Sequence, residues 1–252
     1  DWSSDVCSSD LSNASVTITS CNTTNINANF SLAGGATVLT HISGTLNVNN
    51  GANMIVGSFS SSNVAVRTIN MGSGLWSLTG TGTVWNMGAT NATLNAQQSR
   101  ILILNTASPL SATTFAGGGL TYYSLEHARG SSTATFTLTG NNTFANFIDN
   151  TSTAAHTIIV PAAGTTTFHR FNVRGSSGAL ITFNRSGTSG TSTFAKTGRG
   201  PVCYIDYVTT NNVNATPAST WYAGANSSIA ATGWIVSDAP SSQSTLGVGG
   251  VG

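Results

Sequence analysis

Three stretches in the middle of the chain decide the fold: LTYYSLE at 120–126, NTFANFID at 142–149 and TTFHRFNV at 166–173. Each carries two large apolar residues three positions apart. The first member of the pair recurs after 22 and then 24 residues, at Tyr122, Phe144 and Phe168. A repeat of this length is typical of a supersecondary unit that buries its apolar face only by stacking on its neighbours. The spacing therefore predicts stacked coils.

A second apolar column recurs at nearly the same interval. Its members are Phe136 and Leu138, Ile158 and Val160, and Ile181 and Phe183. Two columns with one period favour a solenoid over a sandwich, because a sandwich does not require like residues at a fixed offset. Short alternating runs between Gly, Asn and Ser clusters continue along the chain, and helix signals are almost absent. We therefore predict an all-β fold, a single-stranded parallel β-helix (β-solenoid) with coils of about 22 residues.

The repeat also predicts which side chains form the inward structural stack. These are Tyr122, Leu125, Phe144, Phe147, Phe168, Phe171, Tyr204 and Tyr207. The last pair lies 36 residues after Phe168, so this placement treats STFAKTGRG at 192–200 as an extra strand or loop on one enlarged coil. It also places Arg170 and Asp206 at matching outward positions on neighbouring coils. Before residue 100 the register is too faint for columns to be assigned.

The two ends of the chain differ from the repeat in composition. DWSSDVCSSDL at 1–11 is acidic and Ser-rich without periodicity, and its back-translation resembles a sequencing adapter. We interpret it as a non-native scar and expect a variant that begins at Ser12 to unfold at the same temperature. The remaining chain then divides into a β-helix at 12–237 and a flexible Gly- and Ser-rich tail or linker at 238–252.

The composition restricts the partners of the protein. Charged residues make up 6% of the chain, against roughly 25% in an ordinary soluble domain. The basic residues are scattered singly, which argues against a nucleic-acid partner. The apolar runs are too short for a membrane span, which needs about 20 residues. Outside 1–11 the cysteines are Cys21 and Cys203, whose separation indicates neither a metal cluster nor a disulfide framework.

Four strings carry a resemblance to a known class of proteins: TFAGGGLTYYSL, TGNNTFANF, AHTIIVPAAGTTTFHRFNV and TWYAGANSSIAATGWIV. They resemble repetitive β-helical proteins of bacteriophages and environmental bacteria, over about residues 80–236. The resemblance implies a right-handed parallel β-helix, often a homotrimer, in a virion tail or on a bacterial surface, and hence an extracellular location. It also implies a host-surface glycan or receptor as the partner, and it carries over no catalytic residue.

Catalytic chemistry has few candidate residues. The acids outside 1–11 are Glu126, Asp149, Asp206 and Asp238. Glycoside hydrolysis usually needs two carboxylates about 5 to 10 Å apart. Glu126 and Asp149 are separated by about one coil and would approach each other on adjacent turns, but we expect both to face water. The same offset brings His127 to Asp149, where we expect a turn contact and no metal. The sequence thus predicts no catalytic residue, no metal site and no cofactor.

Three functional classes fit these features: a structural or receptor-binding protein of a phage tail fibre or spike, a bacterial surface adhesin, and a polysaccharide-cleaving enzyme. The few acids favour the first, which is non-enzymatic. Tyr123, His169 and Arg170 are the predicted glycan contacts, because aromatic and cationic groups on a rigid sheet suit weak, repeated sugar binding. The runs TTTF and TATFTLTG also suggest an ice-binding Thr ladder, but their Thr spacing is too irregular for one.

Overall fold

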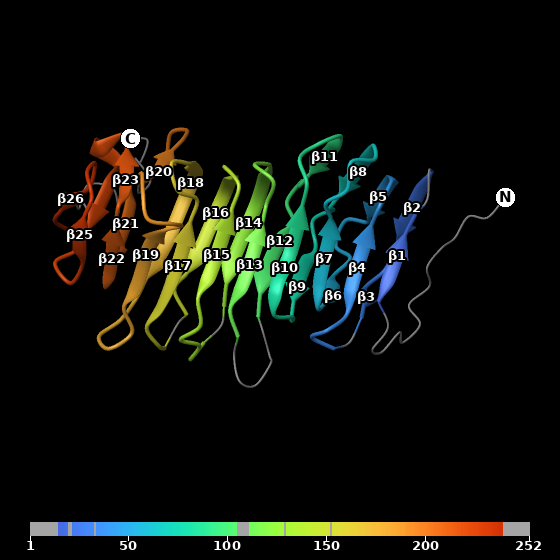
Figure 1. The fold of residues 1–252 in the computed structure, drawn as a ribbon, viewed down its shortest axis with the longest axis horizontal. Coiled ribbons are helices and arrows are strands. Elements are labelled where there is room, and N and C mark those ends of the chain that lie inside the picture. The colour runs from blue at the N-terminus through green and yellow to red at the C-terminus, as the bar shows by residue number, and fades with distance from the viewer. Residues whose placement is uncertain are drawn as a thin grey trace, which may run out of the picture.

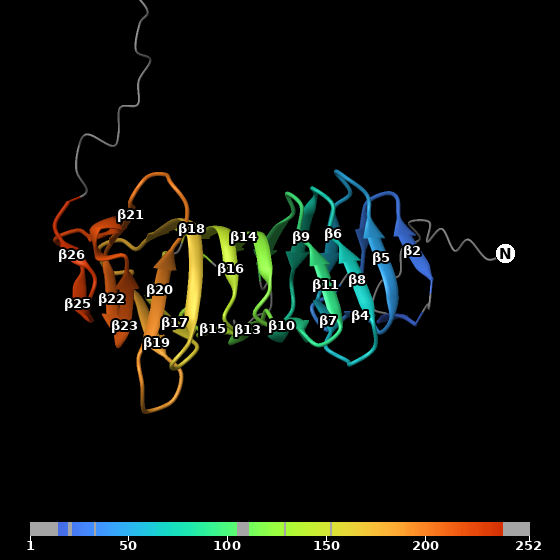
Figure 2. The same ribbon diagram turned by 90° about the horizontal axis from the view of Figure 1, so that it is seen from above.

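The protein forms an elongated β-solenoid of parallel strands (Figures 1 and 2). The computed structural model describes residues 15–19, 22–32, 34–104, 111–128, 130–151 and 153–238. The segment 1–11, Cys21 and residues 239–252 of the predicted tail lie outside the described residues. The turns contain roughly 24 residues, slightly more than the predicted 22. The prediction of an all-β solenoid is confirmed.

Two long walls run along the molecule. Sheet A contains ten strands, β1 (Val16–Ile18), β4 (Val38–His41), β7 (Ser58–Ser61), β10 (Gly82–Met87), β13 (Thr113–Ala116), β15 (Phe136–Thr139), β17 (His156–Val160), β19 (Ile181–Arg185), β22 (Val208–Asn211) and β25 (Ser228–Ala230). The main path of sheet C contains β3 (Phe30–Ser31), β6 (Met54–Val56), β9 (Leu75–Leu78), β12 (Arg100–Ile103), β14 (Thr121–His127), β16 (Thr143–Asp149), β18 (Thr165–Arg174), β21 (Cys203–Asp206), β24 (Trp221–Ala223) and β26 (Ile235–Val236).

Shorter walls complete the coils toward each end of the molecule. Sheet B, at the N-terminal side, contains β2 (Thr23–Ile26), β5 (Gly44–Val48), β8 (Arg67–Asn70) and β11 (Ala92–Asn95). At the C-terminal side, β20 (Ser192–Lys196) pairs with β18 and with β23 (Val213–Thr216), which is followed by a single 3-10 turn, Ala218–Thr220. In Figure 2 sheet B and the β20–β23 pair lie toward opposite ends of the rod.

The core lies between the walls and consists of the inward members of alternating strands. In sheet A, Phe136 is in register with Ile158, and Ile158 with Phe183, and all three side chains are fully buried. The second predicted column is confirmed from Phe136 to Ile158, but the predicted match of Ile158 with Ile181 is wrong, because Ile158 is opposite Phe183 and Ile181 is opposite His156. Stacking like residues lets neighbouring coils bury their apolar faces together, which a single coil cannot do.

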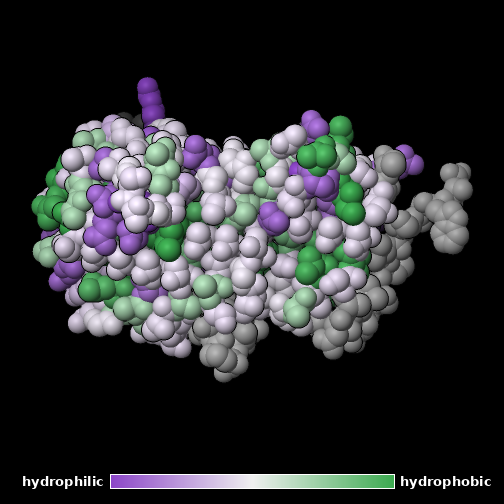
Figure 3. Space-filling view, in the orientation of Figure 1, coloured by the Kyte–Doolittle hydropathy of each residue, from purple (hydrophilic) through white to green (hydrophobic). Residues whose placement is uncertain are grey.

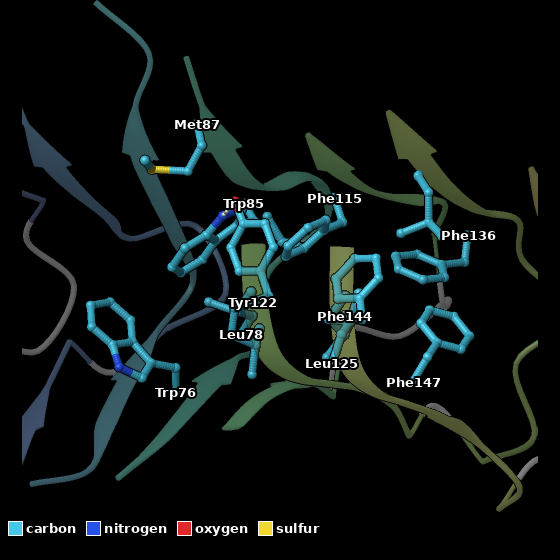
Figure 4. Packing of buried hydrophobic residues seen from close by; sticks show 14 of the residues in the cluster. Trp76, Leu78, Trp85, Met87, Phe115, Tyr122, Leu125, Phe136, Phe144 and Phe147 are labelled. Carbon is cyan, nitrogen blue, oxygen red and sulfur yellow. Dashed lines mark hydrogen bonds between the residues drawn. The ribbon is translucent and has the colours of Figure 1, made fainter. Parts of the chain in front are cut away.

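The aromatic stack is confirmed from Tyr122 to Phe171, and Figure 4 shows its members Tyr122, Leu125, Phe144 and Phe147 in the core. Tyr122 pairs in register with Phe144, and Phe144 with Phe168, with ring centroids 5.6 and 6.0 Å apart. Beside this column, Leu125 pairs with Phe147, and the Phe147 ring lies 5.6 Å from that of Phe171. The repeat seen in the sequence is thus the repeat of the stacked coils.

The predicted placement of Tyr204 and Tyr207 in this stack is wrong. The strand β18 is ten residues long and pairs with two strands, so that Phe168 is opposite Lys196 of β20 and Asn172 is opposite Tyr204 of β21. The extra strand expected within 192–200 exists, but it occupies the place beside Phe168 that had been assigned to Tyr204. Tyr204 and Tyr207 are half-buried and lie outside the apolar core.

The same displacement changes the predicted pairing of charges. Arg170 is opposite Asn146 of β16, and the residue opposite Asp206 is Arg174. The predicted contact between Arg170 and Asp206 is therefore wrong. The partner of Asp206 is four positions further along β18, because β20 covers the first part of that strand.

Candidate functional site

The three predicted glycan contacts lie on the outer face of sheet C but do not form one cluster. Tyr123 is on β14 and 37% of its surface is exposed, whereas His169 and Arg170 are on β18. The strand β16 lies between β14 and β18. The structure therefore divides the predicted contacts between two places on the surface.

Arg170 lines a groove of about 510 Å³, which we call the arginine groove. Its walls are formed by Asn150, Arg170, Phe171, Asn172, Arg174, Pro201, Val202 and Tyr204. Arg170, Asn172 and Arg174 are alternate residues of one strand, so their side chains project from the same face of β18. The sequence predicted Arg174 only as part of a solvated basic face and did not single out Asn172, although the alternation in RFNVR indicates a polar row.

The far wall of the arginine groove is set by the chain between β20 and β21. Pro201 and Val202 precede β21, whose Tyr204 ring lies beneath the Arg174 guanidinium at 5.0 Å from the ring centroid. This cation–π contact holds the long Arg174 side chain in place. The ring nitrogen Nδ1 of His169 lies 3.0 Å from the Thr197 carbonyl oxygen, a hydrogen bond that positions the same segment. His169 thus lies beside the groove and helps to shape it.

Two cationic side chains, Arg170 and Arg174, line the groove, and the carboxylates of Asp206 and Asp238 lie close to its Tyr204. Within the described part of the chain, neither Arg170 nor Arg174 forms an ion pair. The Asp206 carboxylate, opposite Arg174, instead accepts hydrogen bonds from the backbone N–H groups of Tyr207 and Asn226, at 3.0 and 3.3 Å, and from the Asn226 amide at 3.2 Å. The two guanidinium groups therefore remain available to an anionic ligand.

Tyr204 adds a neutral hydroxyl to this groove. Partial burial, followed by the negative charges of Asp206 and Asp238, raises the pKa of the Tyr204 phenol above its ordinary value. The phenol is therefore protonated at neutral pH, and its Oη donates to the Asp238 carboxylate at 3.2 Å. The groove thus combines two cations, two amides and an aromatic ring, with the Asp206 and Asp238 carboxylates beside it.

Tyr123 lines a second hollow, of about 570 Å³, at the end of sheet B. Its other walls are Asn70, Leu94, Asn95, Ala96, Gln97, Thr121, Tyr122 and Ala145. The strand β11 is the last of sheet B, and the next coil, β13–β14, has no strand beside it. The hollow therefore lies where sheet B ends. Its walls include amides and tyrosine rings but no charged residue.

A polar group that the sequence only partly predicted lies inside the solenoid. The Asp149 carboxylate accepts hydrogen bonds from His127 Nδ1 and His156 Nε2, both at 2.8 Å, and all three residues are buried. The expected contact of His127 with Asp149 is confirmed, but it is not a surface turn. His156 was missed; it begins β17, seven residues after Asp149.

His127, Asp149 and His156 offer the donor types that metal sites use, but in this structure they are joined by hydrogen bonds. One carboxylate oxygen and two ring nitrogens lie within 4.8 Å of one another, a set that could hold a metal ion. Burial alone would raise the pKa of Asp149, but the hydrogen bonds from His127 and His156 outweigh it and lower the pKa of that carboxyl. Asp149 is therefore an anion held by its two histidine partners.

The carboxylate pair considered for glycoside hydrolysis does not form. Glu126 is opposite Ile148 of β16 and faces outward, where its Oε2 lies 2.8 Å from Arg100 Nη2. Asp149, one position later on β16, faces the interior. The expectation that both acids face water is wrong for Asp149, and the two carboxylates lie on opposite faces of sheet C, so they cannot flank one sugar.

Comparison with known protein families, curated proteins and solved structures finds no match. In the described residues no helix has the length and apolar character needed to cross a bilayer.

Proposed function

We propose that the protein is a non-enzymatic, receptor-binding β-solenoid of a phage tail fibre or spike, and that it presents the arginine groove to an acidic host-surface glycan. The supporting observation is the row of Arg170, Asn172 and Arg174 along one face of β18, opposite Tyr204. The tail or spike setting follows the sequence resemblance and is part of the proposal.

The spacing of the two arginines suits an extended, repetitive anion. Residues four apart on a strand lie about 13 Å from each other, at about 3.3 Å per residue. A glycan with carboxylate or sulfate groups along its chain would place one acid at each guanidinium, and Asn150 and Asn172 would bond to its hydroxyls. Because both arginines are on one hydrogen-bonded strand, their spacing is fixed before the ligand arrives, which lowers the entropic cost of binding.

Affinity electrophoresis in gels that contain an acidic polysaccharide tests this proposal. The protein should be retarded by a sulfated or uronic-acid polymer and not by neutral dextran. The double variant Arg170→Gln and Arg174→Gln should lose the retardation, and added salt should weaken it in the original chain, because exposed charges are screened.

The control removes one positive charge from the same sheet at a distance from the groove, and it is matched to the single groove variant Arg170→Gln, which should weaken the retardation. Arg100→Gln on β12 loses only the exposed pair with Glu126, and it should bind like the original chain. Equal loss in the control and in the groove variant would show that net charge alone causes retention. Retention that is unchanged in the groove variant would exclude the arginine groove as the binding site.

A further inference from the structure

The outer face of sheet B carries a regular array that sequence inspection did not recognise. Each of its four strands contains the pattern Thr-x-Asn, as TTN at 23–25, TLN at 45–47, TIN at 68–70 and TLN at 93–95. The strands pair in register, which aligns Thr23, Thr45, Thr68 and Thr93 in one column and Asn25, Asn47, Asn70 and Asn95 in another. We call this surface the Thr-Asn face.

The asparagine column is a continuous hydrogen-bonded ladder. Asn47 donates from its amide to the Asn25 amide oxygen at 3.0 Å, Asn70 to Asn47 at 2.5 Å, and Asn95 to Asn70 at 2.6 Å. The three hydrogen bonds therefore run in the same direction along the column and restrain the amides. Each amide within the ladder still has one N–H and one oxygen lone pair for an outside partner.

The hydroxyl groups of the threonine column are available for hydrogen bonds to an outside partner. Among the described residues, none of the four threonine hydroxyls bonds to another group, while the intervening residues Leu46 and Ile69 are fully buried and fix the strands from beneath. The Thr-Asn face has no charged side chain. It is thus a rigid, neutral row of donors, acceptors and methyl groups.

The two columns define a grid with small, constant spacings. Neighbouring parallel strands lie about 4.8 Å apart, and residues two apart on a strand lie about 6.6 Å apart. Spacings of this size are close to the repeat distances between water oxygens on faces of ice. By contrast, the outward Thr column of sheet A is interrupted, because Thr137 is followed by Ile159 and Asn184.

We infer that the Thr-Asn face is an ice-binding surface. Ice is a ligand whose surface repeats donors and acceptors on a lattice, so a pre-ordered grid can match many of its waters at once without a cavity. A charged face would keep its own hydration shell, whereas hydroxyl, amide and methyl groups can hold water in a lattice-like arrangement. This inference does not depend on glycan binding, which involves another wall of the solenoid.

Thermal hysteresis and ice-recrystallisation assays on the full chain test the inference. The original chain should separate the freezing point from the melting point and should keep ice grains small. Thr45→Tyr and Thr68→Tyr place bulky rings in the middle of the Thr column and should abolish both effects. Thr182→Tyr, an outward threonine on sheet A, is the matched control and should retain them.

Circular dichroism and a melting curve for each variant separate folding from surface effects. The inference is overturned if the original chain has no more effect on ice than an equal mass of albumin. It is also overturned if a folded Thr68→Tyr variant retains full activity, or if Thr182→Tyr loses as much activity as Thr68→Tyr. Retention on crystalline cellulose or chitin without any effect on ice would assign the face to a polysaccharide and would equally contradict it.

Discussion

At the residue scale, the solenoid interior contains polar groups whose hydrogen bonds are supplied by neighbouring coils. Arg67 is 1% exposed, and its guanidinium donates to the carbonyl oxygens of Ser61, Ala65, Gly88 and Thr90. Asp149 is held in the same way by two histidines. Most buried polar groups in proteins are hydrogen-bonded, because leaving them unpaired costs free energy, so the partners of Arg67 and Asp149 help to specify how the coils meet.

Asp149→Asn should lower the free energy of unfolding by about 3 kcal/mol or more at pH 7, because it removes the charged partner of a buried network. The lowered pKa of Asp149 means that its contribution is present above the unfolded value, about 3.9, and is lost as the pH falls through the folded value. The difference between the original chain and the variant, measured by denaturant unfolding, should therefore shrink below about pH 4.

The control for this experiment is Glu126→Gln, which removes an exposed ion pair and should cost less than about 1 kcal/mol. If Asp149→Asn were as mild as Glu126→Gln at pH 7, the buried network would contribute little to the fold.

Phe147→Ala should destabilise the protein by about 3 to 5 kcal/mol, through lost transfer energy and the cavity that remains. Its ring is fully buried between the neighbours Leu125 and Phe171. Chemical denaturation should show this loss. Tyr123→Ala, on the outer face of the same sheet, should change stability by no more than about 1 kcal/mol, and a similar cost for both variants would contradict the inward assignment.

At the scale of the elements, the sequence is informative where one coil repeats the last and misleading where a strand is added. Tyr122, Phe144 and Phe168 could be predicted as neighbours because like residues recur at a nearly constant offset. The next coil carries β20, which pairs with the first part of β18, so the aromatic Tyr204 shifted away from the place that the offset predicts. Periodicity cannot reveal which part of a long strand a new strand will cover.

The candidate site was predictable only in part, for the same reason. Arg170 and Tyr123 follow from outward positions on recognised strands, whereas Arg174 and Tyr204 meet only because β21 is offset along β18. The Thr-Asn face was missed because its columns lie on sheet B, a third wall that exists only in the N-terminal coils, where the aromatic repeat is absent.

The pairing of β21 with β18 predicts that the Cys203 thiol is inaccessible to reagents in the native protein. Its side chain is 1% exposed, and burial raises the pKa of its thiol to about 12. The reactive thiolate is therefore scarce at neutral pH. Alkylation with iodoacetamide followed by peptide mass spectrometry should find Cys203 unmodified in the native protein and modified in denaturant. Rapid labelling without denaturant would place Cys203 on the surface and would contradict the pairing of β18 with β21.

At the scale of the whole molecule, the solenoid provides a stiff rod whose walls offer different chemistry to the outside. Figure 3 shows a face dominated by pale residues of intermediate hydropathy, with strongly hydrophilic and hydrophobic residues in small groups. The local features for which we propose binding are the arginine groove on sheet C and the Thr-Asn face on sheet B. Assembly into a homotrimer stays a prediction from the sequence resemblance.

The central claim, that the protein binds an acidic glycan without cleaving it, is tested most directly by size-exclusion chromatography with light scattering. A sulfated or uronic-acid polysaccharide of defined mass is incubated with the protein and then separated. We expect the protein to elute with the polymer, and the polymer mass to stay constant over time. A polymer that becomes shorter would show the protein to be an enzyme, and a protein that elutes alone would contradict glycan binding.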